Sequence, residues 1–133
     1  MLTLRDNLIG SRTMEFAMDE SHTFYLLTLK KNRKVEDIRK NSEGIIHINQ
    51  LDEDMLKSYD IQIRGNFRII SDESTDYYKG IETLGKKNPQ IAEMFRSEMR
   101  NLYHIIGFKA KEITAWNYFM VVNELPKIKI NGI

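Results

Sequence analysis

The segment from Tyr59 to Ser71 constrains the fold more than any other, because apolar and polar residues alternate along most of it. A period of two is that of a β-strand with one face buried. The residues expected to face the interior are Ile61, Ile63, Phe67 and Ile69. Gly65 interrupts this row, so a bend, a bulge or a close contact with the backbone is expected there.

The other patterns place strands early and helices late in the chain. The further predicted strands are Leu8–Met18, His22–Thr28, Gly44–Asn49, Tyr103–Val122 (one strand, or two joined near Lys109–Lys111) and the edge strand Leu125–Ile133. The predicted helices are Lys34–Asn41, Ser74–Lys86 and a helix from the start signal Asn88-Pro89 through Leu102. Because no βαβ units alternate, this order indicates an antiparallel barrel with peripheral helices, a mainly β fold of the α+β class.

Composition excludes several classes of function. The length fits one domain over residues 1–133, and a net charge of only +1 argues against a broad nucleic-acid-binding surface. The chain has no cysteine and its three histidines are far apart in sequence, so neither a disulfide nor a metal site is expected. No signal-peptide pattern and no apolar run of membrane-spanning length occur, so a cytoplasmic protein without membrane contact is expected.

The stretch from Phe24 to Ile38 joins an apolar strand to an amphipathic helix through a cationic loop. Thr28 ends the strand, and Asn32, Arg33 and Lys34 stand where the helix begins. A helix start exposes unpaired N–H groups and the positive end of the helix dipole, so cations there are unfavourable without an anion. The stretch therefore predicts a phosphate site, and a solvated cationic loop is the alternative.

Three motifs, GSRTMEF, FYLLT and KKNRK, follow one another in this order. Together they resemble the FMN-binding split barrels of the pyridoxamine 5′-phosphate oxidase-like superfamily. This resemblance implies an antiparallel, six-stranded split β-barrel. The tail ELPKIKINGI lacks the Arg-x-His segment of the true pyridoxamine phosphate oxidases. The pattern is therefore closer to the general-stress and nitroimidazole-reductase-like branches, and vitamin B6 oxidation is not expected.

The resemblance also implies a cofactor, FMN, and the residues that hold it. The implied FMN contacts are Arg12, Thr13, Met14, Leu27, Thr28, Asn32, Arg33, Lys34 and Trp116. The flavin would supply the electron chemistry, so the expected function is oxidoreduction with NAD(P)H and a small oxidised acceptor, and no catalytic side chain is assigned. A non-enzymatic flavin-binding or stress-response module, or a barrel that binds deazaflavin or haem, are the alternatives.

The resemblance further implies a homodimer with the cofactor at the subunit boundary. The long strands carry apolar residues on both faces, which a chain of this size is not expected to cover alone. The residues expected in the interface are Ile70, Ile105, Ile106, Phe119 and Val121. Trp116 is assigned to the flavin by the resemblance, and a place in the core or in this interface is its alternative.

Overall fold

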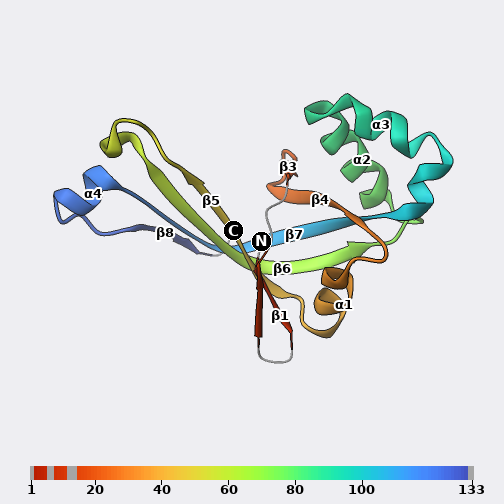
Figure 1. Ribbon diagram of the computed structural model, residues 1–133, viewed down its shortest axis with the longest axis horizontal. Helices are drawn as coiled ribbons and strands as arrows, with labels where there is room; N and C mark the ends of the chain where they lie inside the picture. The colour runs from red at the N-terminus through yellow and green to blue at the C-terminus, as the bar shows by residue number, and fades with distance from the viewer. Residues whose placement is uncertain (1, 6–7, 12–14, 132–133) are drawn as a thin grey trace.

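The computed structural model describes residues 2–5, 8–11 and 15–131, and its strands form one antiparallel sheet in the order β2-β1-β5-β6-β7-β4-β3, with β8 paired to β7 (Figure 1). The strands are β1 (Leu2–Arg5), β2 (Leu8–Ser11), β3 (Ala17–Met18), β4 (Thr23–Leu29), β5 (Glu43–Gln50), β6 (Tyr59–Ile70), β7 (Tyr103–Asn117) and β8 (Ile128–Asn131). The helices are α1 (Arg33–Lys40), α2 (Thr75–Lys87), α3 (Pro89–Phe95) and α4 (Tyr118–Val122), with 3₁₀ turns η1 (Met55–Lys57) and η2 (Glu98–Leu102). The expected antiparallel fold with peripheral helices is confirmed, and β3 and β8 add to its six other strands.

The two longest strands, β6 and β7, run side by side through the molecule and connect two regions (Figure 1). In the first region, β4 pairs with the beginning of β7, and α2 packs on both strands. The second region, which we call the wing, consists of residues 43–66 and 109–131, that is β5, η1, the first part of β6, the last part of β7, α4 and β8 with the turns that join them. α1 packs on β1 and β6 beside the first region, and α4 lies at the far end of the wing.

Apolar residues pack on both faces of the sheet. On one face the rings of Phe67 and Phe108 have centroids 4.5 Å apart and share a buried cluster with Ile38 of α1. On the other face Tyr77 of α2 and Phe95 of α3 have ring centroids 5.8 Å apart. Each fully buried side chain of this size stabilises the fold by about 1.5–3 kcal/mol. The two clusters fix β6 and β7 between α1 and the α2–α3 pair.

Three of the residues expected in a dimer interface are instead core residues. Ile70, Ile105 and Ile106 are at most 4% exposed, because helices cover this part of the sheet on both faces. A strand covered on both faces is apolar on both faces, so the pattern alone does not indicate an exposed surface. Phe119 and Val121 differ from them, since they lie on α4 in the wing and are 52% and 55% exposed.

Gly65 lies at a β-bulge, as its position in the alternating row predicts. The register between β6 and β7 shifts after Arg64, so that Gly65 pairs with Ala110 and Lys111 is left without a partner on β6. A Cβ atom on Gly65 would lie 2.0 Å from the carbonyl oxygen of Lys109. The close backbone approach therefore admits only glycine at this position.

The third predicted helix begins where expected and ends early. Asn88 accepts a hydrogen bond from the N–H of Gln90 at 3.2 Å, so it caps α3 as predicted. The helix ends at Phe95 because the Ser97 side chain starts a separate 3₁₀ turn, η2. Met99 and Leu102 consequently leave the apolar stripe, and each is about half exposed.

Two predicted strands are also shorter than expected. The strand predicted to reach Val122 ends at Asn117, whose side chain accepts the N–H of Met120 at 2.9 Å and begins α4. The strand predicted over residues 8–18 is not continuous, because residues 15 and 16 are outside β2 and β3. There the carbonyl oxygen of Phe16 accepts a hydrogen bond from Lys87 of α2 at 2.6 Å. The Lys87 side chain, and not the backbone of a neighbouring strand, therefore satisfies the carbonyl group of Phe16.

Candidate functional site

The start of α1 shows how the predicted phosphate contacts are held. Asn32 caps the helix, since its side-chain oxygen accepts the N–H of Lys34 at 3.1 Å. Thr28 and Lys34 are buried, with exposed fractions of 3% and 6%. Arg33 is exposed, and its guanidinium has no hydrogen bond or ion pair with the described residues. An anion next to Arg33 would be stabilised both by the guanidinium and by the helix dipole.

Four other predicted FMN contacts precede Thr28 in the chain, and they divide into two groups. Three of them lie outside the described residues: Arg12, Thr13 and Met14. Leu27 immediately precedes Thr28 on β4, so its side chain points to the opposite face of the sheet. There it lines an apolar groove of about 340 Å³ with Phe16 and Met94, below α2 and α3. Leu27 can therefore offer only its backbone to a ligand on the face of Thr28.

Trp116 lies in the wing, far from the start of α1. Its ring makes an edge contact with Tyr118 at 5.8 Å, and the Lys127 ammonium lies 5.7 Å from its centroid. Thr28 pairs with His104, which is twelve residues before Trp116 on β7. At about 3.3 Å per residue this separation is roughly 35–40 Å. One chain therefore does not bring Trp116 to the same site as the predicted phosphate contacts.

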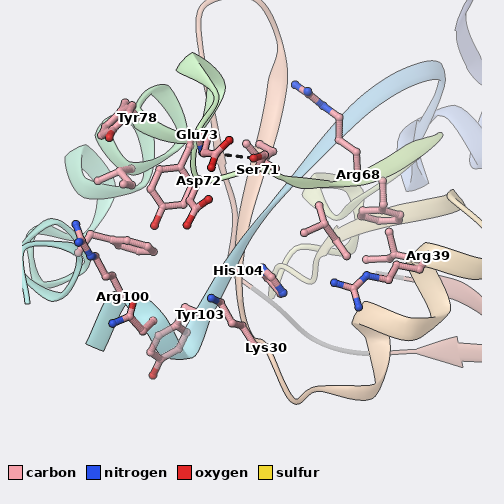
Figure 2. A pocket seen from close by; sticks show the side chains of 18 residues that line it. Lys30, Arg39, Arg68, Ser71, Asp72, Glu73, Tyr78, Arg100, Tyr103 and His104 are labelled. Carbon is pink, nitrogen blue, oxygen red and sulfur yellow. Dashed lines mark hydrogen bonds between the residues drawn. The ribbon is translucent and has the colours of Figure 1, made fainter. Parts of the chain in front are cut away.

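A cleft that the sequence analysis did not predict lies between α1 and α2, at the end of β6 (Figure 2). Its volume is about 780 Å³, and its lining includes Lys30, Arg39, His104, Asp72 and Glu73. Burial lowers the pKa of His104, and the charges of Lys30 and Arg39 lower it further. The excess of cationic residues in KKNRK was a signal for this cleft as well as for the start of α1, because Lys30 belongs to that motif.

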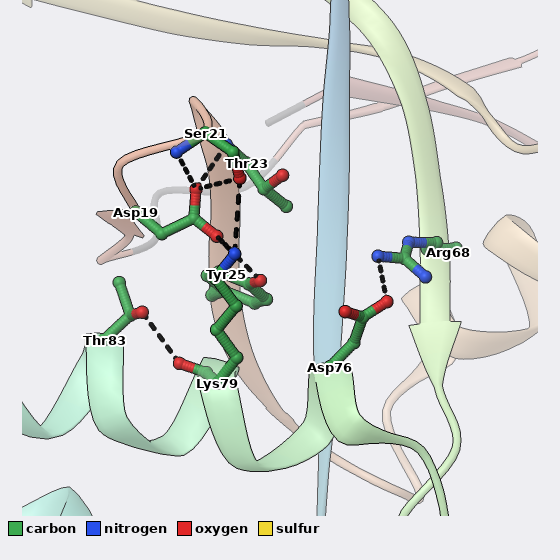
Figure 3. A network of polar contacts seen from close by, with 8 residues as sticks. All are labelled: Asp19, Ser21, Thr23, Tyr25, Arg68, Asp76, Lys79 and Thr83. Carbon is green, nitrogen blue, oxygen red and sulfur yellow. Dashed lines mark hydrogen bonds and ion pairs between the residues drawn. The ribbon is translucent and has the colours of Figure 1, made fainter.

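A second polar cluster holds the turn between β3 and β4 (Figure 3). One carboxylate oxygen of Asp19 accepts the N–H groups of Ser21 and Thr23 at 2.9 and 3.0 Å. The other accepts the Tyr25 hydroxyl at 3.0 Å and lies 3.3 Å from the Lys79 ammonium. Burial alone would raise the pKa of Asp19, but these hydrogen bonds outweigh it and lower the pKa to about 2. Since Lys79 belongs to α2, this cluster ties the hairpin to the helix.

No group of three or more His, Asp or Glu side chains in residues 2–5, 8–11 and 15–131 could hold a metal ion. His47 contacts only Asp60 among the acidic residues described, across β5 and β6. Among the described helices none combines the length and the apolar character needed to cross a membrane.

Comparison with known proteins identifies the fold. No protein-family model matches the sequence, and none of the curated proteins matches it. A protein from Listeria innocua, provisionally assigned as a pyridoxamine 5′-phosphate oxidase, is similar in structure with a TM-score of 0.63 and 22% identity, over 87% of this chain and 85% of its own. An FAD-binding protein from Mesorhizobium loti has a TM-score of 0.68 and 8% identity, over 86% and 80% of the two chains. A haem-binding protein from Mycobacterium smegmatis has a TM-score of 0.76 and 8% identity over 98% of this chain, which spans half the length of that protein.

Proposed function

We propose that this chain, which has the split-barrel fold of the pyridoxamine 5′-phosphate oxidase-like superfamily, binds FMN with its phosphate at the start of α1 and serves as an FMN-dependent oxidoreductase. The observation that carries the proposal is Arg33, an exposed guanidinium without a partner among the described residues at a capped helix start. Similar structures include a flavin-binding protein and a haem-binding protein, so the fold is compatible with both cofactors.

The donors at this site fit a phosphate monoester. Arg33 offers a planar set of N–H donors, the start of α1 offers a positive dipole end, and the Asn32 amide nitrogen makes no other hydrogen bond with the described residues. The further contacts that the resemblance implies are Thr28 and Lys34, which are buried, and Arg12, which lies outside the described residues. The bound flavin would supply electron transfer between NAD(P)H and a small oxidised acceptor. The protein would orient the cofactor and shield it from water.

The distance to Trp116 supports a two-chain site. Trp116 of one chain lies roughly 35–40 Å along β7 from the residue that pairs with its own Thr28, so it would reach a flavin only from a second copy. The wing exposes apolar side chains that a second copy would cover. They are Leu51, Met55, Phe119, Val121, Val122, Leu125, Ile128 and Ile130. We therefore propose a homodimer in which the wing of one chain covers the cofactor site of the other.

A spectrum and one pair of variants test the proposal. Protein mixed with FMN and freed of unbound FMN by gel filtration should retain a flavin spectrum, whereas a Soret band or a single deazaflavin band in the purified protein would contradict the FMN assignment. A charge-assisted hydrogen bond contributes about 1.5–3 kcal/mol, so Arg33→Ala should weaken FMN binding about 10–150-fold. Arg96→Ala removes another exposed arginine, next to α3, and should leave the affinity unchanged. Equal affinities of both variants would refute the phosphate position.

Turnover needs a separate measurement. Rapid mixing of the FMN-loaded protein with NADH or NADPH should bleach the flavin absorbance, and air should restore it. Reduction that is no faster than that of unbound FMN would indicate a flavin-binding module without enzymatic activity.

A further inference from the structure

The cleft between α1 and α2 has an open strand edge as its floor. β5 pairs with β6 only as far as Asn66, and the N–H of Phe67 then donates to the carbonyl oxygen of Ser42 at 2.7 Å. Alternate residues of a strand direct their backbone groups to the same edge, so Ile69 directs its N–H and C=O to the side of Phe67. No other strand of the described residues pairs with β6 on this side beyond Asn66. The cleft therefore contains a backbone donor and a backbone acceptor without a ladder partner.

Cations without partners surround this edge. The side chains of Lys30, Arg39 and Arg100 line the cleft, and none of them makes a hydrogen bond or ion pair with the described residues (Figure 2). Arg68, also in the lining, differs because it pairs with Asp76 at 2.9 Å. Unpaired cations that share a concave site raise the local concentration of anions. The electrostatic field in the cleft therefore favours a negatively charged ligand.

His104 reports the same field from within the cleft. The charged groups that face it are Lys30 from the turn after β4, Arg39 from α1 and Asp72 from the loop after β6. Burial is the largest cause that lowers the pKa of His104. The charges of Lys30 and Arg39 lower this pKa further, and the charge of Asp72 raises it. An anion bound between these cations would reverse their effect on the imidazole.

The size and the walls of the cleft narrow the class of ligand. Its volume of about 780 Å³ is within the range of small-molecule sites, about 300–1,000 Å³. Apolar and aromatic side chains form the wall on the side of α2 and α3, among them Tyr77, Ile81 and Phe95. Asp72 and Glu73, which also line the cleft, disfavour a second negative charge on the ligand. A singly charged head on an apolar body matches these walls.

We infer that this cleft binds a small organic carboxylate with an aromatic or branched apolar body, the carboxylate lying against Lys30, Arg39 and His104. The body lies against the side chains of α2 and α3, and the Ile69 N–H supplies a further donor. The two anion positions are at opposite ends of α1, since Arg39 lies in its last turn and Arg33 in its first, and the sites adjoin where His104 of the cleft pairs with Thr28. The inference does not depend on FMN binding.

Matched probes test the inference with full-length protein, with and without saturating FMN. Phenylacetate should bind in a calorimetric titration, and phenylacetamide, its neutral analogue, should bind at least tenfold more weakly. Arg39→Gln should weaken phenylacetate binding at least tenfold, whereas Lys86→Gln, which changes an exposed lysine of α2 outside the cleft, should not. Equal binding of the two probes, no effect of Arg39→Gln, or tighter binding of phenyl phosphate would overturn the carboxylate site.

A second measurement uses the wild-type protein, so its result cannot come from a perturbation of α1 by Arg39→Gln. In an NMR titration of the wild-type protein, saturating phenylacetate should raise the pKa of the His104 imidazole, because the carboxylate offsets Lys30 and Arg39. The imidazole signals of His22, which lies in the β3–β4 turn away from the cleft lining, should not move when the probe is added. A pKa of His104 that is the same with and without the probe would also overturn the inference.

Discussion

Replacing Asp19 by asparagine should cost stability in an amount that depends on pH. The pKa of Asp19 falls from its ordinary value of 3.8 to about 2 in the folded chain. At 1.36 kcal/mol per unit, this difference corresponds to about 2 kcal/mol of stability at pH 7. Because the folded pKa is the lower one, this stabilisation is present above about pH 4 and is lost as pH falls through about 2. Asparagine keeps one acceptor oxygen but loses the charge that Tyr25 and Lys79 contact.

Urea unfolding followed by circular dichroism at pH 7 and pH 2.5 measures this effect. At pH 7 Asp19→Asn should lower the free energy of unfolding by about 2 kcal/mol, and at pH 2.5 by about a third of that. Glu82→Gln is the control, because Glu82 and its partner Lys86 are 69% and 74% exposed and such pairs contribute little. A loss below 0.5 kcal/mol at pH 7, or a loss equal at both pH values, would refute the role assigned to the charge.

Three further predictions concern the bulge, a helix cap and the wing. Gly65→Ala should destabilise the fold by about 3 kcal/mol or more in urea unfolding, because its Cβ would lie 2.0 Å from the Lys109 carbonyl oxygen. Lys111→Ala at the same bulge is the control and should change the free energy of unfolding by less than about 0.5 kcal/mol. Asn88→Ala should cost about 1 kcal/mol in the same assay through loss of the α3 cap, and an unchanged midpoint would contradict that role. Val122→Asp places a charge on a side chain that is 69% exposed at the end of the wing, so sedimentation should show a monomer for the variant and the proposed dimer for the wild type. Identical sedimentation of both proteins would argue against the wing as the interface.

The regular parts of the fold follow directly from the sequence pattern. The alternation from Tyr59 to Ser71 predicted β6 to within a residue, because one face of the strand meets a core. Gly65 marked the bulge, since only a residue without Cβ fits that close approach. Asn88 and Pro89 marked the start of α3, because caps act through neighbouring residues. Each of these signals is local in the chain.

The errors came from contacts between distant residues. Ile105 and Ile106 were expected in an interface, and only the placement of helices on both faces of β7 shows that they are core. The apolar Tyr118–Val122 was predicted as strand, but the Asn117 cap starts a helix there. The cleft beside β6 escaped prediction for the same reason, since Lys30, Arg39 and His104 meet only through tertiary structure. Within the predicted FMN set, the separation of Trp116 from Thr28 needed the β4–β7 register.

The position of β7 in the chain also shapes how the protein folds. β7 pairs with β4, β6 and β8, so both cores lack an essential strand until this late segment has been synthesised. Its contacts are remote in sequence, as in the pair Leu27 and Ile105, and bringing such segments together costs loop entropy before any contact compensates. Folding should therefore be slower than for a helical domain of equal length. During synthesis on the ribosome, β4, α1 and β6 would emerge before β7, and their apolar faces would stay exposed to water until β7 pairs with the sheet.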